Sequence, residues 1–201
     1  MNMSRAVIVA VVTVAVVAGC SRHDGTTATT PSVDLDAEPA GIVWSDYHGV
    51  DLPTGVDGPH ENRDAATGFT RTPAGAALAA IVHTVHMSIA PSGSWPAVAR
   101  AELAPEHRDA LVTSHELISV DSPADPATAP RIRGYTITSW TPDRAKVDIY
   151  TSFPDRSVAV TAAQVVWHGD WLLTVPDASS SEPAVRTADR VDAAVKLEAP
   201  Q

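Results

Sequence analysis

Two histidines three residues apart are the first candidates for chemistry in this chain. His83 and His86 fall in a segment with a helical pattern, where residues three apart share a face, so they could present two ligands to a metal ion. The sequence holds no His-Glu-x-x-His motif, no acidic residue in that helix, and one cysteine, far away at position 20. We therefore expect two histidines on the helix surface, with no metal and no cofactor.

Other catalytic motifs are missing from the sequence. It contains no Gly-x-Ser-x-Gly elbow, no P-loop and no dinucleotide-binding fingerprint, so hydrolase and nucleotide-binding functions have no local support. The five tryptophans stand out because phenylalanine occurs only twice. We expect Trp140 and Trp167, which lie in strand-like segments, to pack in the core or on a sheet face. The alternative is that they line a cavity together with Tyr150.

The pattern of the first twenty residues indicates an export segment that ends in an attachment site. Residues 6–17 carry no charge and follow Arg5, which is typical of a signal-peptide h-region. This stretch is too short to span a bilayer, which requires ~20 apolar residues. It is followed by Val17-Ala18-Gly19-Cys20, and Cys20 is the only cysteine of the chain.

These four residues resemble the lipobox of bacterial lipoprotein precursors. The resemblance implies cleavage before Cys20, a diacylglycerol thioether on its sulfur, and a mature protein anchored on the extracytoplasmic face of the cell membrane. Two acyl chains suffice for stable attachment. A single cysteine cannot form an intramolecular disulfide, so the exported domain must depend on its core.

The charge balance limits the partners. The formal net charge is −10, from 24 acidic and 14 basic side chains, and residues 1–19 hold one arginine and no acidic residue, so the remainder is more acidic still. Nucleic acid is not expected as a partner because no cluster of Lys and Arg is present. We expect a membrane attachment through Cys20 and a protein partner in the cell envelope.

The elements that must position these residues begin with a central helix. Residues 68–89 combine Thr72 as N-cap, Pro73 at the first helical position, and an apolar stripe at spacings of three and four. A short helix is predicted at residues 95–103 and a third one from Pro105. The stripe comprises Ala74, Leu78, Ile81, Val82, Val85 and Ile89.

From residue 131 the pattern changes to alternation, which predicts strands. The predicted strands span residues 131–140, 146–153, 158–167 and 171–175, with Val147 and Ile149 facing the core. The predicted organisation is a signal peptide at 1–19, a lipidated N-terminus and flexible tether at 20–40, one domain at 41–176, and a poorly ordered or loosely packed tail at 177–201. Residues 49–68 are expected to form a loop draped over the surface.

Helices followed by antiparallel strands indicate an α+β fold, with a cone-like curved sheet of about four strands packed on the N-terminal helices. This order, with Trp167, Gly169, Asp170 and Trp171 in the last hairpin, resembles the nuclear transport factor 2-like superfamily. One branch of it, the ketosteroid isomerases, implies proton transfer by a tyrosine and acidic residues, which would fall to Tyr135, Asp148 and Tyr150. Alternation places Asp148 and Tyr150 outside, which argues against that chemistry.

A second resemblance covers residues 44–80. Gly49-Val-Asp-Leu-Pro53, Gly58-Pro59, Gly68-Phe69 and Thr72-Pro73-Ala-Gly75-Ala are similar to an uncharacterised actinobacterial family of secreted or lipid-anchored proteins often associated with integrative conjugative elements. The resemblance implies a surface accessory protein and brings no catalytic residue. We expect a non-catalytic interaction module. The alternative is a binding protein or enzyme for a small apolar ligand, with a cone cavity ringed by Trp140, Tyr150 and Trp167.

Overall fold

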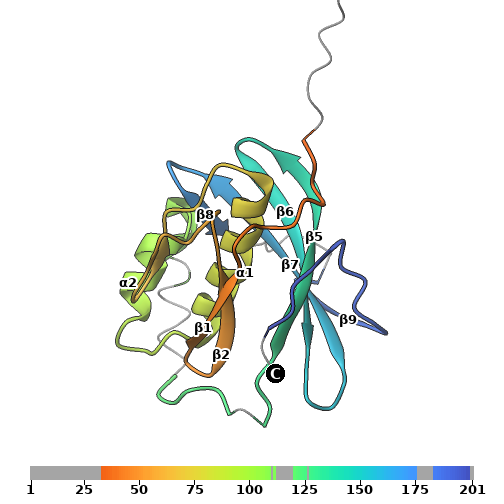
Figure 1. The fold of residues 1–201 in the computed structure, drawn as a ribbon. Helices are drawn as coiled ribbons and strands as arrows, with labels where there is room; N and C mark the ends of the chain where they lie inside the picture. The colour runs from red at the N-terminus through yellow and green to blue at the C-terminus, as the bar shows by residue number, and fades with distance from the viewer. Residues whose placement is uncertain (1–32, 110, 112–119, 126, 176–182, 200–201) are drawn as a thin grey trace, which may run out of the picture. The chain divides into compact units, whose positions relative to one another are not determined.

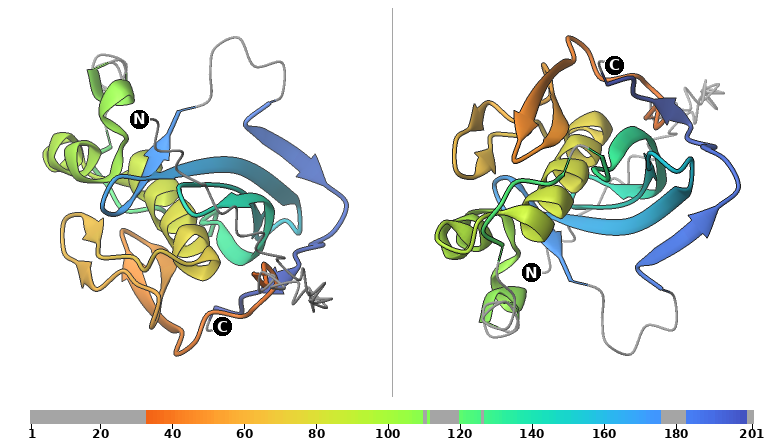
Figure 2. Two further views of the ribbon diagram at one scale, coloured as in Figure 1. Left: turned by 90° about the horizontal axis from the view of Figure 1, so that it is seen from above. Right: turned by 90° about the horizontal axis from the view of Figure 1, so that it is seen from below.

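The computed structural model describes residues 33–109, 111, 120–125, 127–175 and 183–199. In this part of the chain, helices pack against a large antiparallel sheet, which confirms the predicted α+β class (Figure 1). The strand order is β10-β5-β6-β7-β8, and β9 also pairs with β7. The sheet curls around helix α1 without closing into a barrel (Figure 2). None of the described helices is long and apolar enough to cross a membrane.

Helix α1, Pro73–Ile89, is the predicted central helix. The Thr72 hydroxyl accepts a hydrogen bond from the backbone N–H of Gly75 at 3.0 Å, and proline occupies the first turn. The buried surface is wider than the predicted stripe, because every residue from Gly75 to His83 is buried. The reason is that α1 contacts β6, β7 and β8 on one side and β2 and α2 on the other.

The four predicted strands are present with small changes at their ends. They are β5, Arg131–Thr141; β6, Arg144–Ser152; β7, Val158–Trp167; and β8, Trp171–Thr174. In β6, Val147 and Ile149 are buried and Asp148 lies on the other face, as the alternation predicted. One face of the sheet therefore forms the core with α1, and the opposite face does not pack against that helix.

Two further strands bring the sheet to six in the described part of the chain, where about four were expected. Strand β9, Val185–Ala188, pairs with the start of β7, and β10, Val195–Lys196, pairs with β5. Val195 is 1% exposed. The expectation of a poorly ordered or loosely packed tail at 177–201 therefore does not hold for residues 193–197, because β10 and the residues beside it complete the core next to β5.

Gly134 makes the pairing of β10 with β5 possible. Its φ is +148°, and a Cβ at this position would lie 2.3 Å from the carbonyl oxygen of Val195. Any side chain would push β10 away from β5. The glycine inside this strand thus marks a close backbone approach.

The segment expected as a surface loop, residues 49–68, forms strands instead. Strand β1, Val43–Tyr47, and β2, Val50–Thr54, make a hairpin, and β3, Glu61–Asn62, pairs with β4, Ala66–Thr67. Val50 and Leu52 alternate along β2 and are 2% and 0% exposed. They belong to the core, because two alternating apolar residues suffice for one buried face of a short strand.

Helix α2, Trp95–Glu102, follows the prediction within one residue. The third predicted helix begins as a 3-10 turn, η1, Pro105–His107, and most of its expected length lies outside the described residues. Ala104 continues from α2 to the sheet, where its backbone N–H donates to the carbonyl of Leu173 at 2.9 Å. Residues 103–104 thus lie beside β8.

The turn between β7 and β8 holds the segment that leads into α1. The Asp170 carboxylate accepts hydrogen bonds from the backbone N–H groups of Gly68 at 2.6 Å and Phe69 at 3.0 Å. The Trp171 indole N–H donates to the carbonyl of Thr70 at 2.8 Å. The Gly-Asp turn and its tryptophan therefore fasten the start of the central helix to the last hairpin.

Candidate functional site

The most unusual group of titratable side chains is a buried His–Glu–His cluster formed by His83, Glu102 and His86. His83 Nδ1 lies 2.8 Å from Glu102 Oε2, and His86 Nδ1 lies 2.7 Å from Glu102 Oε1. The three side chains are at most 1% exposed. The expectation of two surface histidines was wrong, since α2 covers this face of α1 and supplies Glu102 as the partner.

Hydrogen-bond partners restrict where the protons of the cluster lie. His83 Nε2 faces the carbonyl of Trp171 at 2.9 Å, and a carbonyl only accepts, so this nitrogen carries a proton. His83 Nδ1 and Glu102 Oε2 lie close together, but their hydrogen-bond geometry is not well aligned. Each of the two atoms offers a lone pair, so one of them must carry a proton for the contact to be favourable. Glu102 Oε1 also accepts from the backbone N–H of Ala66 at 2.7 Å.

The electrostatics favour an ionised Glu102. Burial alone would raise the pKa of this carboxyl group, but the charges of His83 and His86 and their hydrogen bonds outweigh burial and lower the pKa to about 2. Burial raises the pKa of the Tyr47 phenol to about 12, and the negative charges of Glu102 and Asp64 act in the same direction. Tyr47 therefore stays neutral beside the cluster.

The cluster is sealed on the side of the first hairpin. The Tyr47 ring stacks on the His86 ring with 3.8 Å between centroids, and Phe69 meets the His83 ring edge-on at 5.2 Å. Within the described residues no group of three or more His, Cys, Asp or Glu side chains could hold a metal ion. The arrangement ties together β1, β4, α1, α2 and β8, and it leaves the three side chains at most 1% exposed.

A feature of α2 could have revealed this cluster from the sequence. Trp95, Val98, Ala99 and Glu102 lie at spacings of three and four, so Glu102 shares the apolar face of α2. A carboxylate on a buried face requires a partner. The histidine pair on the preceding helix is the nearest candidate in the sequence for that partner.

The residues considered for proton transfer are not brought together. Tyr135 is fully buried and pairs across strands with Ile149 on the core face, whereas Asp148 and Tyr150 alternate onto the opposite face. Burial, followed by the charge of Asp57, raises the pKa of Tyr135 above its usual range. The Asp148 carboxylate forms an ion pair with Arg186 at 2.6 Å.

The aromatic side chains considered for a cavity do not ring one. The rings of Trp140 and Trp167 pack against buried Trp171, with centroids 5.5 and 5.3 Å apart, and the Arg71 guanidinium lies 5.3 Å from the Trp167 ring. Tyr150 lies in β6 on the other face of the sheet. Cys20 lies outside the described residues.

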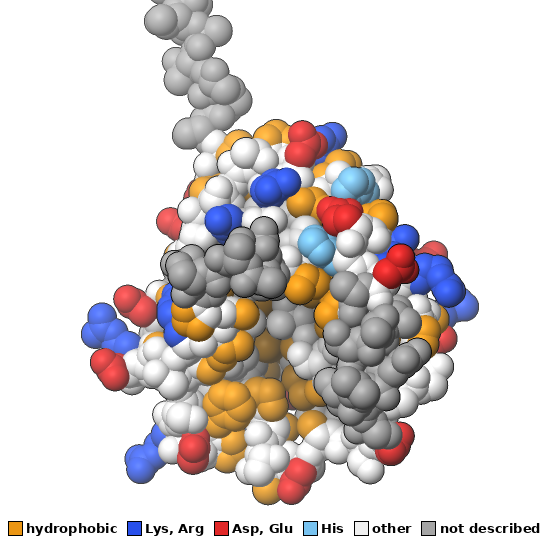
Figure 3. Space-filling view, turned by 180° about the vertical axis from the view of Figure 1, so that it is seen from behind, with side chains coloured by type: hydrophobic (Ala, Val, Ile, Leu, Met, Phe, Trp, Pro, Cys, Tyr) orange, Lys and Arg blue, Asp and Glu red, His pale blue; other side chains and the backbone are white. Residues whose placement is uncertain are grey.

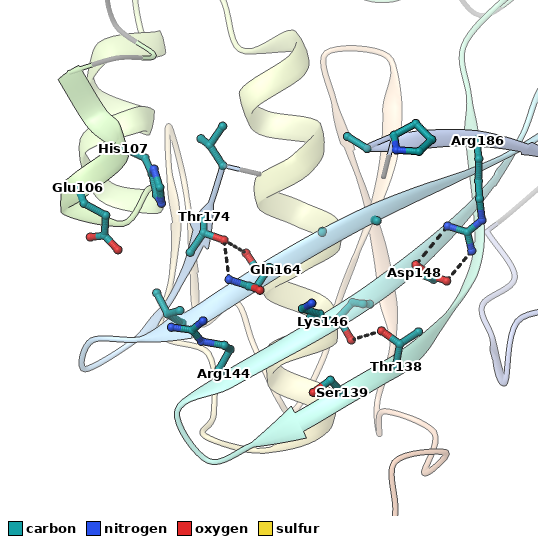
Figure 4. A pocket seen from close by; sticks show the side chains of 17 residues that line it. Glu106, His107, Thr138, Ser139, Arg144, Lys146, Asp148, Gln164, Thr174 and Arg186 are labelled. Atoms are coloured by element: carbon teal, nitrogen blue, oxygen red, sulfur yellow. Dashed lines mark hydrogen bonds and ion pairs between the residues drawn. The ribbon is translucent and has the colours of Figure 1, made fainter. Parts of the chain in front are cut away.

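The face of the sheet that points away from α1 carries an open depression of about 1040 Å³, which we call the sheet-face groove (Figure 4). Side chains from β5 to β9 and from η1 line it. The molecule seen from behind is hollowed, with hydrophobic side chains deep in the hollow and charged side chains around it (Figure 3). The polar residues that line the groove include Thr138, Ser139, Arg144, Lys146, Asp148, Gln164, Thr174 and Arg186.

Comparison with known proteins places the chain in a family. The model of a family described as a domain of unknown function, DUF8175, matches residues 11–194. No curated protein and no solved structure matches the chain.

Proposed function

The chain belongs to the DUF8175 family, and we propose that it is a membrane-anchored surface lipoprotein whose α+β domain acts as a non-catalytic interaction module in the cell envelope. The observation that carries the proposal is the sheet-face groove, a binding surface of about 1040 Å³ on the face of the sheet opposite α1. The buried His–Glu–His cluster is used for packing, because its side chains are at most 1% exposed. A binding role therefore accounts for the groove.

The membrane attachment is supported by the sequence Val17-Ala18-Gly19-Cys20 and the apolar stretch before it. Acylation of Cys20 would hold the domain at the extracytoplasmic face of the cell membrane. The expected result is incorporation of labelled fatty acid and partitioning into the detergent phase, both lost in Cys20→Ala. Detergent partitioning that persists in this variant would refute the lipid anchor.

The interaction role is tested by crosslinking in cells that carry the anchored protein. A photoreactive amino acid at Gln164, in the sheet-face groove, is compared with one at Arg131, which is exposed and does not line the groove. A discrete envelope protein captured from position 164 and not from position 131 is expected. Recovery of the uncrosslinked chain alone from both positions would contradict the proposal.

The proposal also includes the superfamily of the fold and the biological setting of the protein. Assignment to the nuclear transport factor 2-like superfamily is supported by helices that precede the antiparallel strands and by the Trp-His-Gly-Asp-Trp turn at 167–171. A link to actinobacterial conjugative elements is supported by the motifs of residues 44–80 alone. An unchanged frequency of conjugative transfer after deletion of the gene would remove that link.

A further inference from the structure

Several polar groups in the sheet-face groove form hydrogen bonds or ion pairs within it. The Gln164 side chain donates to the Thr174 hydroxyl at 3.2 Å, and that hydroxyl donates to the Gln164 carbonyl. The Thr138 hydroxyl is 3.4 Å from the carbonyl of Lys146. Asp148 and Arg186 neutralise each other at one end of the groove.

Two cations in the groove are not paired in this way. The side chains of Arg144 and Lys146 are exposed and make no hydrogen bond or ion pair with any of the described residues. The remaining charged group that lines the groove is Glu106, on η1, with His107 beside it. Both cations lie on one strand, β6, and contribute to the same surface (Figure 4).

This local charge is opposite to that of the whole chain, whose formal net charge is −10. At physiological ionic strength, charges more than about 8 Å apart are largely screened. A negatively charged group that enters the groove therefore responds mainly to the charges that line it, where Arg144 and Lys146 outnumber the carboxylate of Glu106. The groove is complementary to an acidic ligand although the domain is acidic.

The spacing of the two cations defines the shape of that ligand. One residue separates them on the strand, so their Cα atoms are about 7 Å apart. Alternate side chains of an extended peptide have the same spacing. Ala162 of β7, which is exposed and pairs with Asp148, adds apolar surface to the same groove, and a bare phosphate or a single lipid headgroup would leave it uncovered.

We propose that Arg144 and Lys146 bind an extended acidic segment of a partner protein, with carboxylates at alternate positions paired to the two cations and an apolar side chain against Ala162. This inference rests on the proposed function, because it identifies the partner chemistry of the same groove.

The test measures binding of a fluorescent peptide to the full chain in detergent, by anisotropy. The peptide carries glutamates at two alternate positions among valine and threonine residues. Reversal of both charges in Arg144→Glu/Lys146→Glu is expected to weaken binding by about tenfold or more, because two attractive contacts become repulsive. The matched control, Arg63→Glu/Arg131→Glu, changes net charge equally at exposed positions outside the groove and is expected to bind like the wild type.

Three outcomes would overturn the inference: no saturable binding of the peptide, equal weakening in the groove variant and the control, or binding of anionic phospholipid vesicles or inorganic phosphate in place of the peptide. The crosslinking experiment separates this failure from failure of the proposed function. A partner still captured from position 164 in Arg144→Glu/Lys146→Glu would preserve the interaction role and reject only the acidic segment.

Discussion

Glu102 shows how a fully buried charge is tolerated in this domain. Each of its oxygens lies within 2.8 Å of an imidazole nitrogen, and Oε1 also accepts from a backbone N–H. Removing such a charge from water costs several kcal/mol, so the cluster contributes little net stability compared with apolar packing. Its effect is on specificity, since any other placement of α2 against α1 would leave a carboxylate and two imidazoles without partners.

Two substitutions of Glu102 are expected to differ strongly. In Glu102→Gln, the amide oxygen can still accept from Ala66 and His86, and the amide NH₂ can donate to Nδ1 of a neutral His83, so the loss should be about 1 kcal/mol at neutral pH. Glu102→Ala leaves these groups buried without partners and should cost about 3–5 kcal/mol. Urea denaturation measures both values. Equal losses would show that the charge itself, and not the hydrogen-bond partners, is required.

The same residue predicts acid sensitivity. The pKa of Glu102 falls from an ordinary value of 4.5 in the unfolded chain to about 2 in the fold. A lowered pKa gives stability that is complete above pH 4.5 and is lost as the pH falls toward 2, roughly 3 kcal/mol in all. Over this interval the wild type should lose roughly 3 kcal/mol relative to Glu102→Gln, so that its advantage of about 1 kcal/mol at neutral pH is reversed near pH 2. A difference that stays constant from pH 5 to pH 2 would contradict the ionised buried carboxylate.

At the scale of the elements, the sequence predicts the helices and strands whose pattern lies within their own residues. Helix α1 and strands β5 to β8 have an N-cap, a period or an alternation within their own residues. The hairpin of β1 and β2 was missed because glycines, prolines and aspartates surround a strand with only two buried apolar side chains, Val50 and Leu52. Strands β9 and β10 were missed because they are short and their pairing depends on β7 and β5, which are distant in the sequence.

The candidate site was harder to predict than the fold. His83 and His86 were noticed, but their burial depends on α2, and Glu102 was not considered as their partner. The sheet-face groove follows from which strands lie side by side, and Arg144 and Lys146 resemble ordinary exposed cations in the sequence. The proposed lipobox, by contrast, depends on no tertiary structure because it is a local pattern of residues.

The start of α1 provides a prediction for an element. A Cβ on Gly75 would lie 2.1 Å from the backbone carbonyl oxygen of Thr70, which no side-chain rotation can relieve. Alanine improves helix propensity by about 1 kcal/mol, but the clash should outweigh this gain, for a net loss of about 2 kcal/mol in Gly75→Ala. Gly93→Ala is the control, because no heavy atom lies within 4 Å of its Cβ position, and a change within about 0.5 kcal/mol is expected. Thermal melting of the two variants makes the comparison, and equal melting temperatures would contradict the close contact.

For the molecule as a whole, the C-terminal segment closes the core. Ala193, Val195 and Leu197 alternate inward beside β5, and Lys196 points outward. Val195→Asp places an unpaired carboxylate in the core and should cost about 3 kcal/mol or more. Lys196→Asp introduces the same side chain on the exposed face and should change stability by about 0.5 kcal/mol or less. Wild-type denaturation curves for both variants would show that residues 193–197 are not part of the folded unit.

The bonds from Asp170 to the segment before α1 span 101 and 102 residues of chain. A ribosome adds ~5–20 residues per second, so residue 170 is made roughly 5–20 s after residue 68. Until residue 170 has been added, α1 can form its turns but lacks both the hydrogen bonds from Asp170 and its cover by β8. A nascent chain of this protein therefore carries an incompletely covered apolar helix that is open to chaperones until strand β8 has been synthesised.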